Sequence, residues 1–115
     1  MRVHRSIPER RTLDGVVFDS ITECEHYANL KLLLRDGVIS ELKMQTRFDL
    51  IVNEIHIAYY YADFCYLKGG VAIVEDVKAW VKSKKTGKML PRLDRETGMK
   101  LKLMRAIYGI EVDLV

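Results

Sequence analysis

Two aspartates and a lysine form the most reactive pattern in this sequence. Asp63 lies in one strand-like run, and Asp76 and Lys78 lie in the next run, beyond the pair Gly69-Gly70. A Gly-Gly pair between two runs rich in Ile, Val, Tyr and Phe is typical of a two-residue hairpin turn, because glycine reaches the positive φ angles that such a turn needs. A turn at this pair places Asp63 directly opposite Asp76. Side chains alternate along a strand, so Lys78 shares the face of Asp76.

Two carboxylates facing each other across a hairpin repel. With about 5 Å between them and an effective dielectric near 20, the repulsion is about 3 kcal/mol, a sizeable part of the stability of a small domain. A hard divalent cation that takes oxygen ligands from both would offset this cost. The pattern therefore predicts a metal site at Asp63 and Asp76, with Lys78 placed to act on what the metal holds.

The elements that must position these residues can be outlined from the sequence. Ser20 is a good helix N-cap, Glu23 follows three residues later as in a capping box, and Gly37 gives a stop signal, so we expect a helix over residues 21–35. Glu23 has two open roles, closing the capping box or joining the site. Strands are expected at residues 42–52, 55–67 and 71–80, with a turn at Asn53-Glu54.

A second helix should begin between Asp94 and Thr97 and end at Tyr108 before Gly109, and a last strand should span residues 110–115. The element order is αβββαβ, which indicates an α/β (α+β) fold with a central mixed sheet flanked by helices. The 115 residues suffice for one domain over 1–115, with residues 1–15 as an irregular basic arm. The arm carries four arginines that either contact phosphate or belong to a frayed terminus: Arg2, Arg5, Arg10 and Arg11.

Positive charge gathers in the last third of the chain. The segment from Lys78 to Arg105 contains ten Lys or Arg and only two acidic residues, Asp94 and Glu96. The whole chain has a net charge of only +3. Such asymmetry indicates either a polyanion-binding segment or a solvated loop and helix face. Residues 82–91 read as a turn-rich basic loop. The candidate nucleic-acid contacts are Lys82, Lys84, Lys85, Lys88, Arg92, Lys100 and Lys102.

Composition excludes several other classes of protein. No window has the roughly 18 continuous apolar residues of a membrane span, and the N-terminus lacks the apolar core of a signal peptide, so we expect a cytoplasmic protein. Cys24 and Cys65 are far apart in sequence and are expected to be reduced thiols. The histidines have neither metal-binding spacing nor a nucleophile partner. The run Tyr59-Tyr60-Tyr61 offers two interpretations, stacking on bases or packing across strands.

An Asp on one strand, Asp-x-Lys on the next and a Glu on the preceding helix resemble the PD-(D/E)XK nucleases, with Glu23, Asp63, Asp76 and Lys78 as the matching residues. Ala62 replaces the proline of the signature. The stretches FDSITECEHYANLKLL, ADFCYL, VEDVKAW and AIYGIEV resemble a family of small phage and prophage endonucleases similar to Holliday-junction-resolving enzymes, with Ala79 where these often carry glycine.

This resemblance implies a restriction-endonuclease-like core and metal-dependent hydrolysis of phosphodiester bonds in DNA. Asp63, Asp76, the carbonyl of Val77 and Glu23 would hold Mg²⁺ or Mn²⁺, and Lys78 would orient or deprotonate the attacking water. No organic cofactor is implied. Gln45, in the phrase MQTRF, is either a helper at the site or an ordinary polar sheet residue.

The implied substrate is branched or otherwise structured DNA, cut by a homodimer in the cytoplasm of a bacterial host that carries the phage or prophage. Two alternatives remain open. One is a catalytically silent nucleic-acid-binding module of the same fold. The other is an end-cutting subunit of a transposition machine that depends on a partner. Binding without metal-dependent turnover would distinguish the former, and activity only with a partner the latter.

Overall fold

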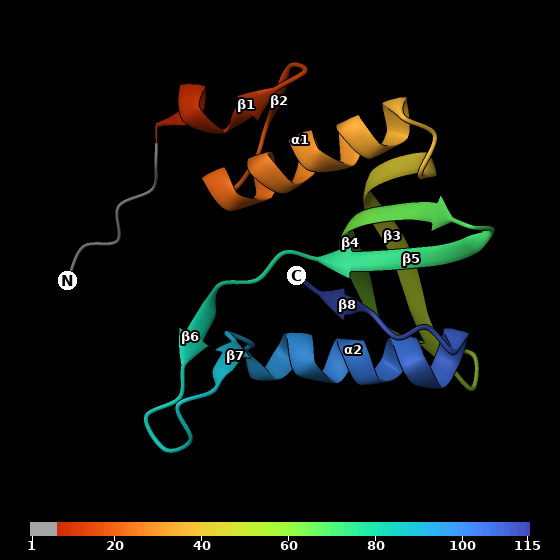
Figure 1. Ribbon diagram of the computed structural model, residues 1–115. Coiled ribbons are helices and arrows are strands. Elements are labelled where there is room, and N and C mark those ends of the chain that lie inside the picture. The colour runs from red at the N-terminus through yellow and green to blue at the C-terminus, as the bar shows by residue number, and fades with distance from the viewer. Residues whose placement is uncertain (1–6) are drawn as a thin grey trace. The chain divides into compact units, whose positions relative to one another are not determined.

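The structure, a computed structural model, describes residues 7–115. The chain up to Ser40 forms one compact unit and Glu41–Val115 form a second. The expected order of helix, three strands, helix and strand is present, with two additional short hairpins (Figure 1). The fold is therefore of the mixed α+β kind, while a single domain over residues 1–115 stays a prediction.

The first unit is built around α1 (Ile21–Arg35), whose bounds are those expected from its caps. The hydroxyl of Ser20 accepts a hydrogen bond from the Glu23 backbone N–H at 3.0 Å. Within this unit the Tyr27 hydroxyl donates to the Asp14 carboxylate at 2.8 Å, and the Tyr27 and Phe18 rings lie 5.0 Å apart. These contacts hold the helix against the chain segment that precedes it.

The expectation of an irregular arm over residues 1–15 is wrong where the structure describes it. Pro8–Arg11 form a 3₁₀ turn (η1), and β1 (Thr12–Leu13) pairs antiparallel with β2 (Val16–Val17). Arg11 is buried, and its guanidinium donates to the carbonyl of Phe18, so this side chain is structural. Arg10 is exposed, while Arg2 and Arg5 lie outside the described residues.

The second unit contains a four-stranded sheet in the order β3-β4-β5-β8. Its strands are β3 (Ser40–Val52), β4 (Ile55–Lys68), β5 (Val71–Asp76) and β8 (Asp113–Leu114). The turns at Asn53-Glu54 and Gly69-Gly70 both form as predicted, and all four turn residues have positive φ. β5 pairs antiparallel with β4 and parallel with β8, so the sheet is mixed as expected.

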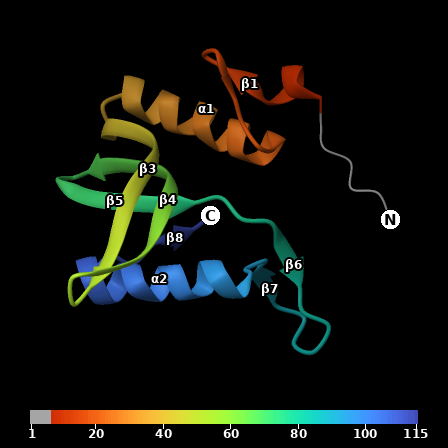
Figure 2. The same ribbon diagram turned by 180° about the vertical axis from the view of Figure 1, so that it is seen from behind.

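Helix α2 (Arg95–Tyr108) runs along one side of this sheet in both views (Figures 1 and 2). Asp94 caps its first turn by accepting from the Thr97 N–H at 2.7 Å, and Gly109 ends it with φ 66°. Met104 is fully buried against Leu50, Tyr60, Ala62 and Val74. This core fixes α2 against the strands that carry Asp63 and Asp76.

Two strands differ from expectation near the site. β5 ends at Asp76 and not at Trp80, and β8 covers only two of the residues expected in the last strand. The expected basic loop over residues 82–91 is instead a small hairpin of β6 (Trp80–Lys82) and β7 (Met89–Pro91), which Figure 1 shows beside α2. The Ser83 hydroxyl accepts from the N–H groups of Lys85 and Thr86 and thereby organises the turn between them.

The two cysteines are free thiols, as predicted. Among the helices of residues 7–115, none has the length and apolar character needed to cross a membrane.

Candidate functional site

The hairpin of β4 and β5 sets the geometry of the site. Its ladder runs from Lys68 opposite Val71 to Phe64 opposite Glu75, so the next residues, Asp63 and Asp76, face each other as predicted. At this point hydrogen bonds from the backbone to side chains take the place of the backbone ladder. The Asp63 N–H donates to Asp76 Oδ1 at 3.0 Å. The Val77 N–H likewise donates to Asp63 Oδ2 at 2.9 Å. Each aspartate therefore holds the backbone of the opposite strand, which is why β5 ends here.

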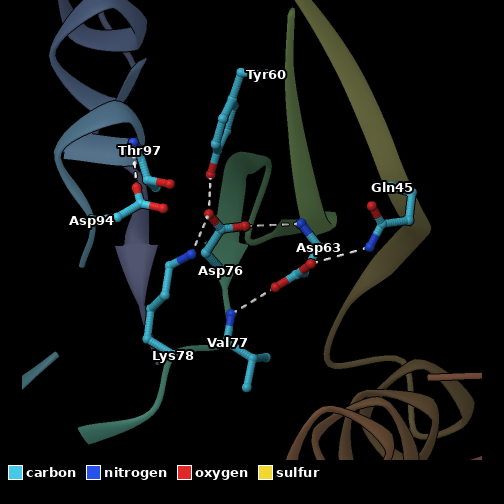
Figure 3. A network of polar contacts seen from close by, with 8 residues as sticks. All are labelled: Gln45, Tyr60, Asp63, Asp76, Val77, Lys78, Asp94 and Thr97. Carbon is cyan, nitrogen blue, oxygen red and sulfur yellow. Dashed lines mark hydrogen bonds and ion pairs between the residues drawn. The ribbon is translucent and has the colours of Figure 1, made fainter. Parts of the chain in front are cut away.

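The remaining oxygens of the two carboxylates have side-chain partners (Figure 3). Asp63 Oδ1 accepts from the Gln45 amide at 3.1 Å. Asp76 Oδ2 accepts from the Tyr60 hydroxyl and lies 3.6 Å from Lys78 Nζ. The two aspartates, Lys78 and Gln45 thus form one polar network, and their orientations are fixed by contacts on three strands and the segment after β5.

Burial and charge shift the ionisation of this network. Loss of solvent raises the pKa of Asp63, and repulsion from the Asp76 carboxylate adds to the rise, while the N–H of Val77 and the amide of Gln45 oppose it. Burial and the hydrogen bond to Asp76 raise the pKa of Tyr60 far above its ordinary value, so its hydroxyl stays a donor. The shift at Asp63 indicates that its negative charge is only partly compensated by the protein.

Gln45 reaches Asp63 from an unusual backbone conformation. Its φ is 52°, in the left-handed region, although it lies within β3. A non-glycine residue in that region costs about 1–3 kcal/mol, and such residues gather at functional sites. The helper role considered for Gln45 is therefore compatible with a residue that is held in strain beside the carboxylates.

Tyr60 is a site residue that sequence reasoning misses. It is 4% exposed and its hydroxyl contacts Asp76, which is 3% exposed. The available signal is its position on the buried face of β4 together with Ala62 and Phe64, because a buried tyrosine hydroxyl almost always needs a polar partner.

An open hollow of about 220 Å³ lies over this network and extends to α2. Its lining residues are Tyr60, Tyr61, Asp63, Asp76, Lys78, Thr97 and Lys100. The hydrogen bonds from Thr97 lower the pKa of Asp94, and the charges of Lys78 and Lys100 add to this effect. Lys100 also lies 3.3 Å from Glu96. The ammonium groups of Lys78 and Lys100 thus line the hollow together with the carboxylates of Asp63 and Asp76.

The other predicted residues come from other parts of the chain. Glu23 belongs to the first unit, where it is buried in the first turn of α1, and its role as a metal ligand stays a prediction. Lys102 is exposed on α2. Exposed positions on or beside the β6–β7 hairpin are held by Lys82, Lys84, Lys85, Lys88 and Arg92.

The donors available to a metal are two carboxylates and one carbonyl. In the part of the chain from residue 7 onward, no group of three or more His, Cys, Asp or Glu is placed to hold a metal ion. Val77 supplies the third oxygen. The Lys78 N–H donates to Val115 O at 2.9 Å, next to β8. The Val77 carbonyl and the Lys78 N–H belong to the same trans peptide and therefore point in opposite directions. The Val77 carbonyl thus points away from β8 and toward the side of Asp63.

This all-oxygen set fits Mg²⁺ or Mn²⁺ better than zinc. Magnesium keeps several waters and commonly binds through one or two carboxylates together with a phosphate of the substrate. Each carboxylate oxygen of the pair accepts one hydrogen bond from the protein and retains a further lone pair. The arrangement can therefore hold a hard cation without losing the contacts that orient it.

The paired carboxylates, the lysine and the adjoining hollow thus lie together on a mixed α+β scaffold. The chain belongs to the family described as "Protein of unknown function (DUF1064)", whose model matches residues 5–108. No curated protein and no solved structure matches the chain.

Proposed function

We propose that this protein is a metal-dependent DNA endonuclease with a restriction-endonuclease-like core. The observation that carries the proposal is the facing pair Asp63 and Asp76 with Lys78 3.6 Å from Asp76 Oδ2, at the end of the β4–β5 hairpin. The succession α1, β3, β4, β5, α2, β8 supports it, because this is the order expected of such a core.

Asp63, Asp76 and the carbonyl of Val77 would hold Mg²⁺ or Mn²⁺, and Glu23 is proposed as a further ligand. When bound, the cation supplies a water of lowered pKa and neutralises negative charge on the phosphate. The remaining contribution comes from the chain itself. Gln45 and the Val77 N–H orient Asp63, while the Tyr60 hydroxyl and the Asp63 N–H orient Asp76.

Lys78 is the proposed catalytic residue for positioning the attacking water and stabilising the negative charge on the phosphate. Its ammonium lies beside Asp76 and lines the hollow, so it is within reach of a phosphate that occupies that space. There the ammonium can orient the attacking water, or donate to the phosphate oxygens as negative charge accumulates. Deprotonating the water would require Lys78 as the neutral amine, which would take up the water proton and become the ammonium. Lys100, on α2, also lines the hollow and would add a second positive charge for binding the phosphate.

The proposed substrate is branched or otherwise structured DNA, cut by a homodimer in the cytoplasm of the host cell. Lys82, Lys84, Lys85 and Lys88 are exposed on the β6–β7 hairpin, and no acidic residue occurs between Lys78 and Leu93. Such a hairpin would contact phosphates in a way that positions the substrate without reading its sequence.

Cleavage of a labelled four-way junction, beside a matched linear duplex, tests the proposal. Each DNA is incubated with Mg²⁺, Mn²⁺ or EDTA and with the wild type, Asp76→Asn or the control Asp36→Asn, which changes an exposed carboxylate. We expect metal-dependent cutting of the junction by the wild type and Asp36→Asn only. Equal cutting of both DNAs would retain the nuclease and remove the preference for branches. Binding without cutting under any metal would identify a silent binding module instead.

A further inference from the structure

The solvent-facing side of β4 is unusual in composition. Every second residue from Ile55 to Tyr61 lies on this side, and all four are exposed and apolar or aromatic: Ile55, Ile57, Tyr59 and Tyr61. The exposed side of an antiparallel strand normally carries polar residues. This face continues directly to Asp63, two positions beyond Tyr61, so whatever covers it would also lie at the candidate site.

Tyr59 and Tyr61 are the largest side chains of this face, 44% and 51% exposed. Their ring centroids lie 6.5 Å apart, and Tyr61 also lines the hollow over the two aspartates. The Arg47 guanidinium lies 5.0 Å from the Tyr59 ring centroid, and the His56 ring lies 4.3 Å from it. Arg47 also lies 3.3 Å from Asp49, which holds it beside the ring.

We infer that Tyr59 and Tyr61, with Arg47, form a stacking platform for unpaired bases next to the phosphate that is cut. This inference rests on the proposed function for the identity of the polymer. Exposed aromatic rings interleaved with a cation are the usual means of binding single-stranded nucleic acid, since every base has a face that can stack. A purely apolar partner would leave the polar site beside Asp63 without a complement.

The orientation of the rings bears on which nucleotides they can take. Their centroids lie 6.5 Å apart and their planes are inclined at 46° to each other, so each ring would stack on a base of its own and the two bases would not be stacked regularly on each other. The consequence is a preference for DNA with unpaired nucleotides at the cut, such as a branch point or a bulge, over perfect duplex.

Binding of a fluorescein-labelled dT oligonucleotide of about twelve residues, followed by anisotropy in EDTA, tests the platform without cleavage. The wild type over residues 1–115 is compared with Tyr59→Ala, Tyr61→Ala, the double alanine variant and Tyr59→Phe, and with the control Ile57→Ala on the same exposed face. We expect each tyrosine variant to bind about 5- to 100-fold more weakly. Tyr59→Phe and Ile57→Ala should bind as the wild type does.

Unchanged binding by the double variant would overturn the inference, as would an equal loss in Ile57→Ala. A change from dimer to monomer in sedimentation, with oligonucleotide binding retained, would also overturn it and assign the face to a second copy of the chain. The proposed nuclease can fail separately. If no metal supports cutting but oligonucleotide binding still depends on Tyr59 and Tyr61, the platform stands alone.

Discussion

Replacing Asp63 by asparagine should stabilise the metal-free protein while removing its response to magnesium. Two negative charges face each other at Asp63 and Asp76, and burial together with this repulsion raises the pKa of Asp63. An asparagine at this position would keep the shape of the side chain. Its carbonyl oxygen can still accept from the Val77 N–H, and its amide can donate to Gln45 after the Gln45 side chain rotates.

The magnitude follows from two opposing contributions. Removing one charge of a pair about 5 Å apart relieves about 3 kcal/mol at an effective dielectric near 20. Making the hydrogen bond from the Val77 N–H neutral instead of charge-assisted costs about 1 kcal/mol, and the bond from Gln45 loses a similar or smaller amount. We therefore expect Asp63→Asn to raise the free energy of unfolding by about 1–2 kcal/mol at pH 7.

Urea unfolding in EDTA, followed by circular dichroism, measures this change, with Asp36→Asn as the control for an exposed carboxylate. The pH dependence has a defined sign. Because folding raises the pKa of Asp63, this group stabilises the fold fully only below its ordinary pKa of 3.8 and loses that contribution as the pH rises. The advantage of Asp63→Asn should therefore shrink to nothing near pH 3, where the carboxyl is protonated in both states.

Addition of 10 mM Mg²⁺ completes the test. For a dissociation constant of about 1 mM, the wild type should gain about 1.4 kcal/mol, and Asp63→Asn should gain almost none. A loss of stability in Asp63→Asn under EDTA at pH 7 would refute the argument from repulsion. An equal gain from Mg²⁺ in both proteins would refute the location of the metal.

Three further predictions concern stability. Tyr60→Phe removes the hydroxyl that donates to the buried Asp76 carboxylate and should lower the free energy of unfolding by about 2 kcal/mol. The control Tyr61→Phe, at an exposed position, should change the free energy of unfolding by less than about 0.5 kcal/mol. The midpoints of urea unfolding distinguish the two variants. Burial raises the pKa of Tyr27 to about 12 and also raises the pKa of Tyr66. The contribution of the two protonated hydroxyls to the free energy of unfolding is therefore complete below about pH 10 and falls as the pH rises further. Tyrosinate absorbance should show both groups deprotonating at a higher pH than a free tyrosine does. Gly70→Ala, at φ 78°, should cost about 1 kcal/mol or more in the same urea assay, and an unchanged midpoint would contradict the assigned turn.

The hairpin and the facing aspartates can be predicted because both depend on local rules. Two glycines reach positive φ, and a period of two then fixes which side chains oppose each other. The bounds of α1 follow in the same way from Ser20 and Gly37. These signals lie within a few residues of the structure they determine.

Other features depend on contacts between distant segments. The sequence pattern predicts that β5 continues to Trp80, but the Asp63 carboxylate takes the Val77 N–H that a longer ladder would have used. The sequence pattern indicates a loop at the place where the β6–β7 hairpin forms. The hairpin has little signal in the sequence, because its strands have three residues each and its turn depends on a hydrogen bond to the Ser83 hydroxyl. The positive φ of Gln45 has no signal in the sequence, since only the fold holds it in that conformation.

Lys78 is proposed to act on a phosphate held beside Asp63 and Asp76. Single-turnover cleavage by Lys78→Met, with Mn²⁺ binding measured on the same protein, tests this role, and Lys68→Met, at an exposed position at the end of β4, is the control. We predict that Lys78→Met binds Mn²⁺ as tightly as the wild type or more tightly and cleaves about 10²- to 10⁴-fold more slowly, while Lys68→Met retains the single-turnover rate. Cleavage by Lys78→Met at the wild-type rate would contradict this role of Lys78.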